Sequence, residues 1–173
     1  MTDSRRKGAN AEREVARLLE QWWKQLEPGC RFVKTPLSGG WSGPSVRADF
    51  QTSGDLTTTA KRFPWTIEVK RREMWALDRL LAGRPSPVWK WWLQACTQAA
   101  EAKRDPVLWF RKSREPWRCL GLVRTFHDGR LPGMIVAVPE LYRRKSKGSR
   151  FAVMFLAEDL IAMKPEMYAR ETE

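Results

Sequence analysis

Two short β-prone runs joined by a turn constrain this chain more than any other part of its sequence. The stretch Gly54–Lys70 reads GDLTTTAKRFPWTIEVK, and both LTTT and TIEVK are rich in β-branched residues. Because side chains alternate between the two faces of a strand, Glu68 and Lys70 share one face and the apolar residues between them share the other. The spacing permits a hairpin, which would bring Asp55 close to Glu68. We therefore expect two carboxylates and a lysine in one small patch.

This patch has the composition of a site for a hard divalent cation. Magnesium prefers oxygen ligands, usually one or two carboxylates together with waters and substrate phosphates. Asp55 and Glu68 are candidate ligands, and the main-chain carbonyl of Val69 is a candidate third. Lys70 would supply a fixed positive charge that orients a water or stabilises an attacked phosphate. These groups suit phosphodiester hydrolysis, with Mg²⁺ as the expected cofactor and Mn²⁺ as a substitute.

The charge balance favours a polyanionic partner. The chain has 173 residues, with 32 Lys and Arg against 20 Asp and Glu, a formal net charge of +12. Nucleic acid is the commonest partner of so basic a protein, and an anionic membrane is the alternative. The sequence has no long apolar run, signal segment or lipidation motif, so a cytoplasmic protein without a membrane partner is expected. The length suits one domain, with a core over about residues 5–125 and further strands and a short helix in 126–173.

Cysteine and histidine are too few for several common kinds of site. The three cysteines, Cys30, Cys96 and Cys119, form no C-x-x-C pair, and His127 is the single histidine. This pattern excludes an ordinary Cys/His zinc site and does not favour a disulfide framework. It also removes the usual base for a serine or cysteine nucleophile. In an enzyme, carboxylates and lysine would therefore do the chemistry.

The first helix supplies a further carboxylate. Residues 1–27 are predicted to open with a basic arm, SRRKG, and to continue as a helix with Asn10 as its N-cap. Glu12 lies within about 40° of the centre of the apolar stripe, and Glu14 lies about 120° away. Glu12 is therefore expected to face inward, although a glutamate in a first helical turn is also favoured by the helix dipole alone.

These motifs resemble those of a known class of nucleases. Gly54-Asp55, a spacer and Glu68-Val69-Lys70 resemble the PD-(D/E)XK signature, with GD in place of PD. The string KGANAERE, residues 7–14, resembles the opening helix of archaeal- and phage-type Holliday-junction resolvases, whose K-G-x-x-x-E-R glutamate completes the metal site and matches Glu12. The resemblance covers roughly the first 125 residues. It implies an α/β, restriction-endonuclease-like fold in which helices flank a mixed central β-sheet.

The same resemblance assigns a role to a serine. Residues 30–36 are predicted to form a strand, and a loop rich in glycine and serine follows. In the resolvases, a serine after this strand lies near the scissile phosphate, and Ser38 matches its position. The interval from Ser38 to Asp55 is longer than in that family, which leaves Asp49 as a competing first carboxylate. Asp55 is preferred because it leads directly into a β-prone run.

Candidate DNA contacts are basic residues close to the predicted catalytic edge, together with one glutamine of the helix predicted over residues 88–103. They are Arg5, Arg6, Lys7, Lys34, Arg71, Arg72, Gln98, Arg111 and Lys112. Cations placed there would meet phosphates, although each one is equally compatible with solvated surface. The resemblance implies a glutamine near the active site, and Gln98 or Gln94 could serve, unless both are simply exposed.

The remaining apolar runs complete the predicted sheet. Strands are expected over residues 106–110, 118–123, 134–138 and 151–156, and short helices over 74–81 and 157–163. Most of the ten tryptophans are expected in the core or in a subunit interface.

The combined prediction is a magnesium-dependent DNA endonuclease that resembles Holliday-junction resolvases. Cutting two strands of a four-way junction symmetrically implies a homodimer. The alternatives are a repair or restriction-type nuclease that acts on another DNA structure, and a nucleic-acid-binding protein without catalysis.

Overall fold

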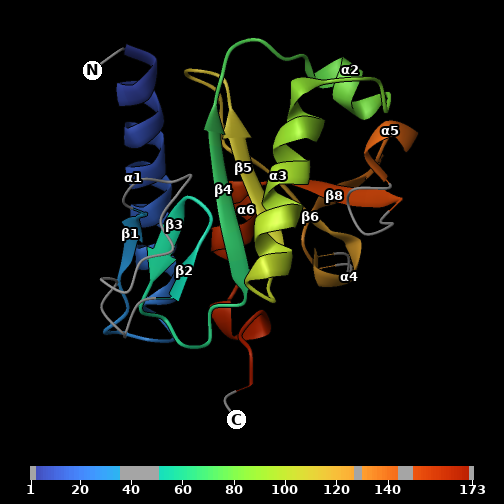
Figure 1. Ribbon diagram of the computed structural model, residues 1–173. Helices are drawn as coiled ribbons and strands as arrows, with labels where there is room; N and C mark the ends of the chain where they lie inside the picture. The colour runs from blue at the N-terminus through green and yellow to red at the C-terminus, as the bar shows by residue number, and fades with distance from the viewer. Residues whose placement is uncertain (1–2, 36–50, 127–129, 144–149, 172–173) are drawn as a thin grey trace.

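A five-stranded mixed sheet with helices on both faces forms the centre of the computed structural model, which describes residues 3–35, 51–126, 130–143 and 150–171 (Figure 1). The strand order is β4-β5-β6-β8-β7. The strands are β4 (Trp65–Arg71), β5 (Asp105–Arg111), β6 (Arg118–Leu122), β7 (Gly133–Ala137) and β8 (Phe151–Leu156). This arrangement confirms the predicted fold class.

Only β4 and β5 run parallel, with Glu68 opposite Leu108, and the other neighbouring pairs are antiparallel. Parallel strands need a crossover connection, which α2 (Leu77–Leu81) and α3 (Pro87–Glu101) provide here. Ser86 caps α3 by accepting a hydrogen bond from the Val88 N–H. The crossover makes β4 an edge strand, so one side of its backbone is free to receive other groups.

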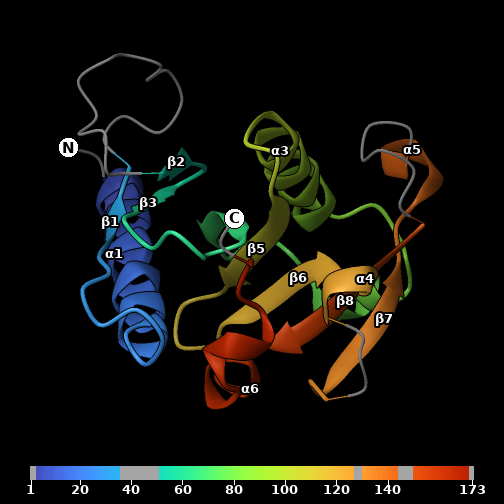
Figure 2. The ribbon, with the colours of Figure 1, turned by 90° about the horizontal axis from the view of Figure 1, so that it is seen from below.

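The two faces of the sheet carry separate apolar clusters. Ile67 and Val69 pack with α1 (Asp3–Trp23) and α6 (Ala157–Ala162) on one face. Leu108 and Phe110 pack with α2 and α3 on the other. Figure 2 shows α3 and α6 on opposite sides of the sheet. Since Glu68 is level with Leu108 in the parallel register, it points away from the face that buries Ile67.

Tryptophan accounts for much of this packing. Eight of the ten tryptophans are buried, which confirms the expectation that most belong to the core. The buried tryptophans are Trp22, Trp23, Trp65, Trp75, Trp89, Trp92, Trp109 and Trp117. Among the described residues no helix is both long and apolar enough to span a membrane.

A second, three-stranded antiparallel sheet with the order β1-β3-β2 lies between α1 and the β4 edge (Figure 1). Its strands are β1 (Phe32–Lys34), β2 (Gln51–Ser53) and β3 (Leu56–Thr58). The predicted hairpin between the two β-prone runs is therefore wrong, because β3 pairs with β1 and β2. One isolated parallel bridge, between Gly54 and Ile67, joins the two sheets.

The first helix begins earlier than its sequence suggests. Helix α1 starts at Asp3, so the basic SRRKG segment is helical and Asn10 is not the N-cap. Instead, the Asn10 side chain accepts a hydrogen bond of 3.0 Å from Arg13, one turn further along. The prediction failed because Asn favours caps without being excluded from helix interiors.

The other predicted elements are present with small shifts of their ends. Three elements were not predicted: β2, which falls in the predicted loop, and the short helices α4 (Val123–Phe126) and α5 (Glu140–Arg143). A 3₁₀ turn at Pro165–Met167 follows α6.

Candidate active site

The site forms where the chain passes close to the free edge of β4. Gly54 has φ +72°, and a Cβ atom there would lie 2.5 Å from the carbonyl oxygen of Ile67. A glycine is therefore required both for the left-handed backbone and for the close approach. The Asp55 N–H, next in the chain, donates a 2.9 Å hydrogen bond to that carbonyl.

Two further contacts determine the position of Asp55. Its carbonyl accepts a hydrogen bond from the Thr35 N–H at 2.9 Å, which ties it to the end of β1. Its carboxylate Oδ2 accepts from the Val69 N–H, also at 2.9 Å. In a strand, the N–H and C=O of one residue point to the same edge, so the Val69 carbonyl points toward the side where Asp55 lies. Asp55 is buried, and its carboxylate is held on the N–H of the same residue.

Glu68 and Lys70 form an ion pair on the same strand. The Lys70 ammonium donates to Glu68 Oε1, as the two-residue alternation predicts. The Glu68 side chain is fully buried, and its second oxygen, Oε2, accepts no hydrogen bond within the described parts of the chain. Burial raises the pKa of Glu68 to about 7, and the negative charge of Asp55 adds to this effect, while Lys70 opposes it. A buried carboxylate oxygen without a donor is a natural position for a cation.

Glu12 reaches the site from α1. It is buried on the inward face of the helix, as the helical spacing predicts, and the Lys34 ammonium donates to its carboxylate. Burial raises the pKa of Glu12; the hydrogen bond from Lys34 opposes the rise, and the charge of Asp55 increases it. Because Asp55 and Lys70 both act on Glu12, and Glu12 acts on Glu68, the charges of these side chains gather in one region.

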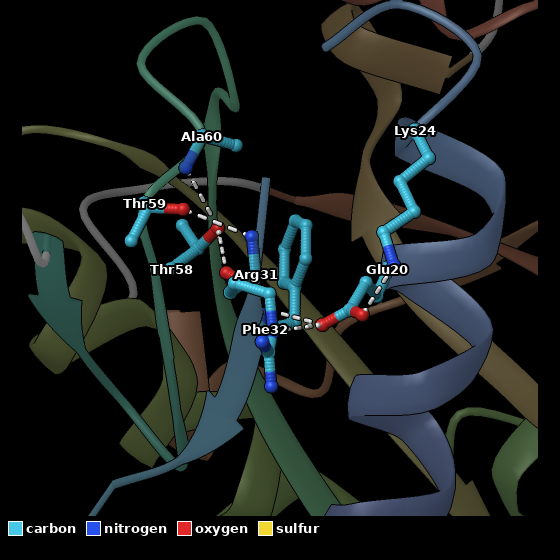
Figure 3. Close-up of polar contacts among 7 residues, drawn as sticks. All are labelled: Glu20, Lys24, Arg31, Phe32, Thr58, Thr59 and Ala60. Carbon is cyan, nitrogen blue, oxygen red and sulfur yellow. Dashed lines mark hydrogen bonds and ion pairs between the residues drawn. The ribbon is translucent and has the colours of Figure 1, made fainter. Parts of the chain in front are cut away.

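The small sheet that carries Lys34 is fixed to α1 by a further glutamate (Figure 3). Glu20 accepts a 2.9 Å hydrogen bond from the Phe32 N–H at the start of β1. The preceding residue, Arg31, is held by β3 and the residue after it, since its N–H donates to Thr59 Oγ1 and its carbonyl accepts from Thr58 Oγ1, each at 2.9 Å. These contacts hold β1 between α1 and β3, which positions Lys34 for Glu12.

The carboxylates are gathered but do not form a three-ligand cage. Within the four described ranges, no group of three or more His, Cys, Asp or Glu side chains is arranged to hold one metal ion. Charged groups influence each other's pKa over greater distances than metal–ligand bonds span. The lack of a three-ligand cage is therefore compatible with the electrostatic coupling of Glu12. Asp55, Glu68 and the Val69 carbonyl suit magnesium, which commonly takes one or two carboxylates and keeps several waters.

Several predicted DNA contacts lie around this site. Arg6, Lys7 and Arg72 are exposed, and the partly exposed Lys112 lies with its ammonium 5.3 Å from the centre of the Trp75 ring. The guanidinium of Arg71 lies against the hydroxyl of Ser113, with nitrogen–oxygen distances of 3.3 and 3.4 Å.

Arg111 has a different environment from the one predicted. It is 16 % exposed, donates to Glu14 at 2.6 Å and lies 4.3 Å from the centre of the Trp117 ring. These contacts join α1 to β5, which is a structural role. Gln98 is partly buried and its Oε1 atom has no partner in the described part of the molecule, whereas Gln94 is exposed. Ser38 and Asp49 lie outside the described residues, and the side chain of Arg5 is not described.

Lys34 was predicted as a DNA contact without a partner in the site, and its ammonium pairs with Glu12 while the side chain stays 31 % exposed. The strand alternation contained the signal, since Lys34 shares a face with Phe32, which is buried in the cluster that contains α1. The partner on α1 could not be read from the sequence, because the two residues are 22 positions apart.

The chain matches a known protein family. A family model described as a phage putative PDDEXK endonuclease matches residues 3–127. The matched part contains Glu12, Lys34, Asp55, Glu68 and Lys70, while β7, α5, β8 and α6 follow it. No curated protein and no solved structure matches the chain.

Proposed function

Because the chain belongs to this PDDEXK endonuclease family, we propose that it hydrolyses phosphodiester bonds in DNA with Mg²⁺, and that its substrate is a four-way junction. The match covers most of the chain and includes every described residue of the candidate active site. The observation that carries the proposal is the Asp55–Glu68 pair at the β4 edge, where Glu68 Oε2 is buried without a donor among the described residues.

Asp55, Glu68 and the Val69 carbonyl would hold the ion. Burial and the neighbouring charge of Asp55 raise the pKa of Glu68, which is the expected signature of a site built for positive charge. When bound, Mg²⁺ would stabilise charge on the phosphate and lower the pKa of a water. Glu12 is attached to Lys34 outside this pair, which suits it to positioning a water.

The reaction in this proposal is a simple hydrolysis. The oxygen of a water forms a bond to phosphorus and the water gives up a proton, one ester P–O bond breaks, and the leaving oxygen takes up a proton, so that no net proton is gained or lost in this step. Lys70 supports this step because its ammonium is held beside Glu68 while remaining partly accessible. From there it can orient the attacking water or stabilise charge that develops on the phosphate.

We also propose that the substrate is branched DNA and that the protein acts as a homodimer. The KGANAERE helix resembles that of Holliday-junction resolvases, and Glu12 of that string is buried at the site. Symmetric cutting of a junction needs two equivalent sites, which a two-fold dimer would supply. A net charge of +12 and the exposed cations Arg6, Lys7 and Arg72 support a polyanionic substrate.

The first experiment separates a nuclease from a binder without catalysis. Wild type, Asp55→Asn and Asp78→Asn are incubated with labelled four-way junction in Mg²⁺ and then in chelator. Asp78 is an exposed aspartate on α2 and serves as the matched control. We expect cleavage by wild type and Asp78→Asn in Mg²⁺ only, and a loss of on the order of 10²-fold or more in Asp55→Asn. Cleavage that persists in chelator or in Asp55→Asn would remove the assigned chemistry.

The second experiment tests the substrate. The same protein is given four-way junction, linear duplex, flap and single strand at equal concentration. Preferential cutting of the junction, at symmetric positions, supports the resolvase assignment. Equal cutting of all forms, or cutting of another form alone, would instead favour the repair or restriction-type nuclease.

A further inference from the structure

One large apolar side chain projects from the turn that follows the catalytic strand. Met74 is 86 % exposed, more than any other large hydrophobic residue whose side chain the structure describes. It comes four residues after Lys70, so at most about 14 Å of extended chain separates the two. Single exposed apolar residues are common and need no special explanation. The surroundings of Met74 are what make it unusual.

The turn that carries Met74 is anchored through Trp75. The Trp75 indole N–H donates a 2.9 Å hydrogen bond to the Arg72 carbonyl, which closes the turn. Its ring is 6 % exposed and packs edge-on against Phe110, with ring centroids 5.1 Å apart. Met74 is therefore displayed by a fixed backbone, so that on binding only its side chain would have to become ordered.

A second set of contacts ties this turn to the one that follows β5. The Arg72 N–H donates to the Arg111 carbonyl at 3.1 Å. The Glu73 carboxylate accepts hydrogen bonds from the N–H and the hydroxyl of Ser113, and these lower the pKa of Glu73. The Glu73 carboxylate, next to Met74 in the chain, is thus held by hydrogen bonds within the protein.

Cations lie close to the residues on either side of the exposed methionine. Lys112 and Arg118 lie over the ring of Trp75, at 5.3 and 5.7 Å from its centre. Arg72, two residues before Met74, is exposed, and Lys7 is close enough to contribute to the lowered pKa of Glu73. An apolar tip among cations fits a ligand that combines phosphates with stacked apolar rings, which is the chemistry of DNA.

We propose that Met74 is a wedge that inserts between neighbouring bases beside the cleaved phosphate, so that cleavage depends on how easily the DNA unstacks there. The proposal rests on the proposed function for the position of the cleaved phosphate. Apolar side chains, methionine among them, insert into base steps and kink DNA where unstacking is easy. Fourteen ångströms spans about four base steps, so the tip is within reach of the bases that flank the active site.

The first experiment measures base unstacking under conditions in which the DNA is not cleaved. Four-way junction and duplex DNA carrying 2-aminopurine near the cleavage position are titrated with protein in chelator, and the fluorescence of the probe is recorded. The proteins are wild type, Met74→Ala, Met74→Leu and Leu141→Ala; Leu141, 73 % exposed on α5, provides a matched apolar truncation elsewhere. We expect fluorescence to rise with wild type, Met74→Leu and Leu141→Ala, and to remain low with Met74→Ala.

The second readout is cleavage in Mg²⁺. Met74→Ala should cut fully paired DNA about tenfold more slowly, which corresponds to about 1.4 kcal/mol, and a mismatch at the adjacent step should restore the rate. Wild-type behaviour of Met74→Ala in fluorescence and in cleavage of paired DNA would overturn the wedge. The fluorescence is measured without metal. If the protein binds DNA but does not cut it, the proposed nuclease activity is refuted, and the fluorescence still shows whether Met74 unstacks bases.

Discussion

Replacing Glu68 by glutamine should make the metal-free protein more stable at neutral and alkaline pH. Glu68 is fully buried beside Asp55, and its pKa is raised from 4.5 to about 7, first by burial and then by the Asp55 charge. The folded protein therefore keeps a proton on this group between these pH values, where the unfolded chain has lost it. Stability falls as pH rises through this interval, since the native state binds more protons. Glutamine cannot ionise, so the variant does not lose stability over this pH interval.

The size of the effect follows from the two pKa values. The difference between 4.5 and about 7, at about 1.4 kcal/mol per pH unit, gives about 3 kcal/mol at full ionisation. For a chain of this length, that corresponds to roughly 6–12 °C in Tm. Lys70 does not reverse the sign, because it remains partly exposed and its ammonium can donate to the amide oxygen of the variant.

The assay is urea unfolding in chelator between pH 4.5 and pH 8, with Glu171→Gln, an exposed glutamate near the C-terminus, as the control. Glu68→Gln should match wild type at the acid end and exceed it increasingly up to about pH 7. Added Mg²⁺ at pH 8 should then stabilise wild type and leave the variant unchanged, since binding to the native state raises its stability. Parallel pH profiles for wild type and Glu68→Gln would refute the assignment of this buried charge.

Two further predictions concern the backbone bridge and the basic residues. Gly54→Ala should lose several kcal/mol of stability, because its Cβ would lie 2.5 Å from the Ile67 carbonyl. Gly83→Ala, which has a similar left-handed φ of +63° but a nearest atom at 3.5 Å, should lose only about 1 kcal/mol; equal losses in thermal unfolding would contradict the close approach. Arg72→Ala should reduce the salt dependence of DNA binding by about one phosphate contact at unchanged stability. Arg111→Ala should lower Tm because it breaks the Glu14 and Trp117 contacts. If Arg72→Ala lowered Tm and Arg111→Ala reduced the salt dependence instead, Arg72 would be the structural residue and Arg111 the DNA contact.

The parts of the site that follow from local periodicity could be predicted. The two-residue period of β4 sets Glu68 beside Lys70, and the helical period of α1 turns Glu12 inward. Both predictions depend only on neighbours within one element. Charge and motif then suggest the chemistry, and the family match supports an endonuclease.

Pairings between distant segments could not be predicted. The hairpin was an inference from spacing alone, and spacing does not distinguish it from β3 joining a separate sheet. Arg111 was expected to face DNA because nothing in its local sequence indicates Glu14, which lies 97 positions away. A strand end that is basic in sequence can be neutralised internally once a helix packs beside it.

The rigidity of Asp55 explains why the charge conflict at this site persists. Its N–H donates to the Ile67 carbonyl, its carbonyl accepts from Thr35, and its carboxylate accepts from Val69, so it cannot move away from Glu68 without breaking backbone contacts. Glu68 is confined in turn because it sits within a paired strand. Repulsion that could be relieved by a side-chain rotation at the surface must here be met by a proton or a cation. At low pH a proton on Glu68 meets this repulsion, and above about pH 7 a bound cation would add to the charge of Lys70, which would link the stability of this site to the ion of the proposed reaction.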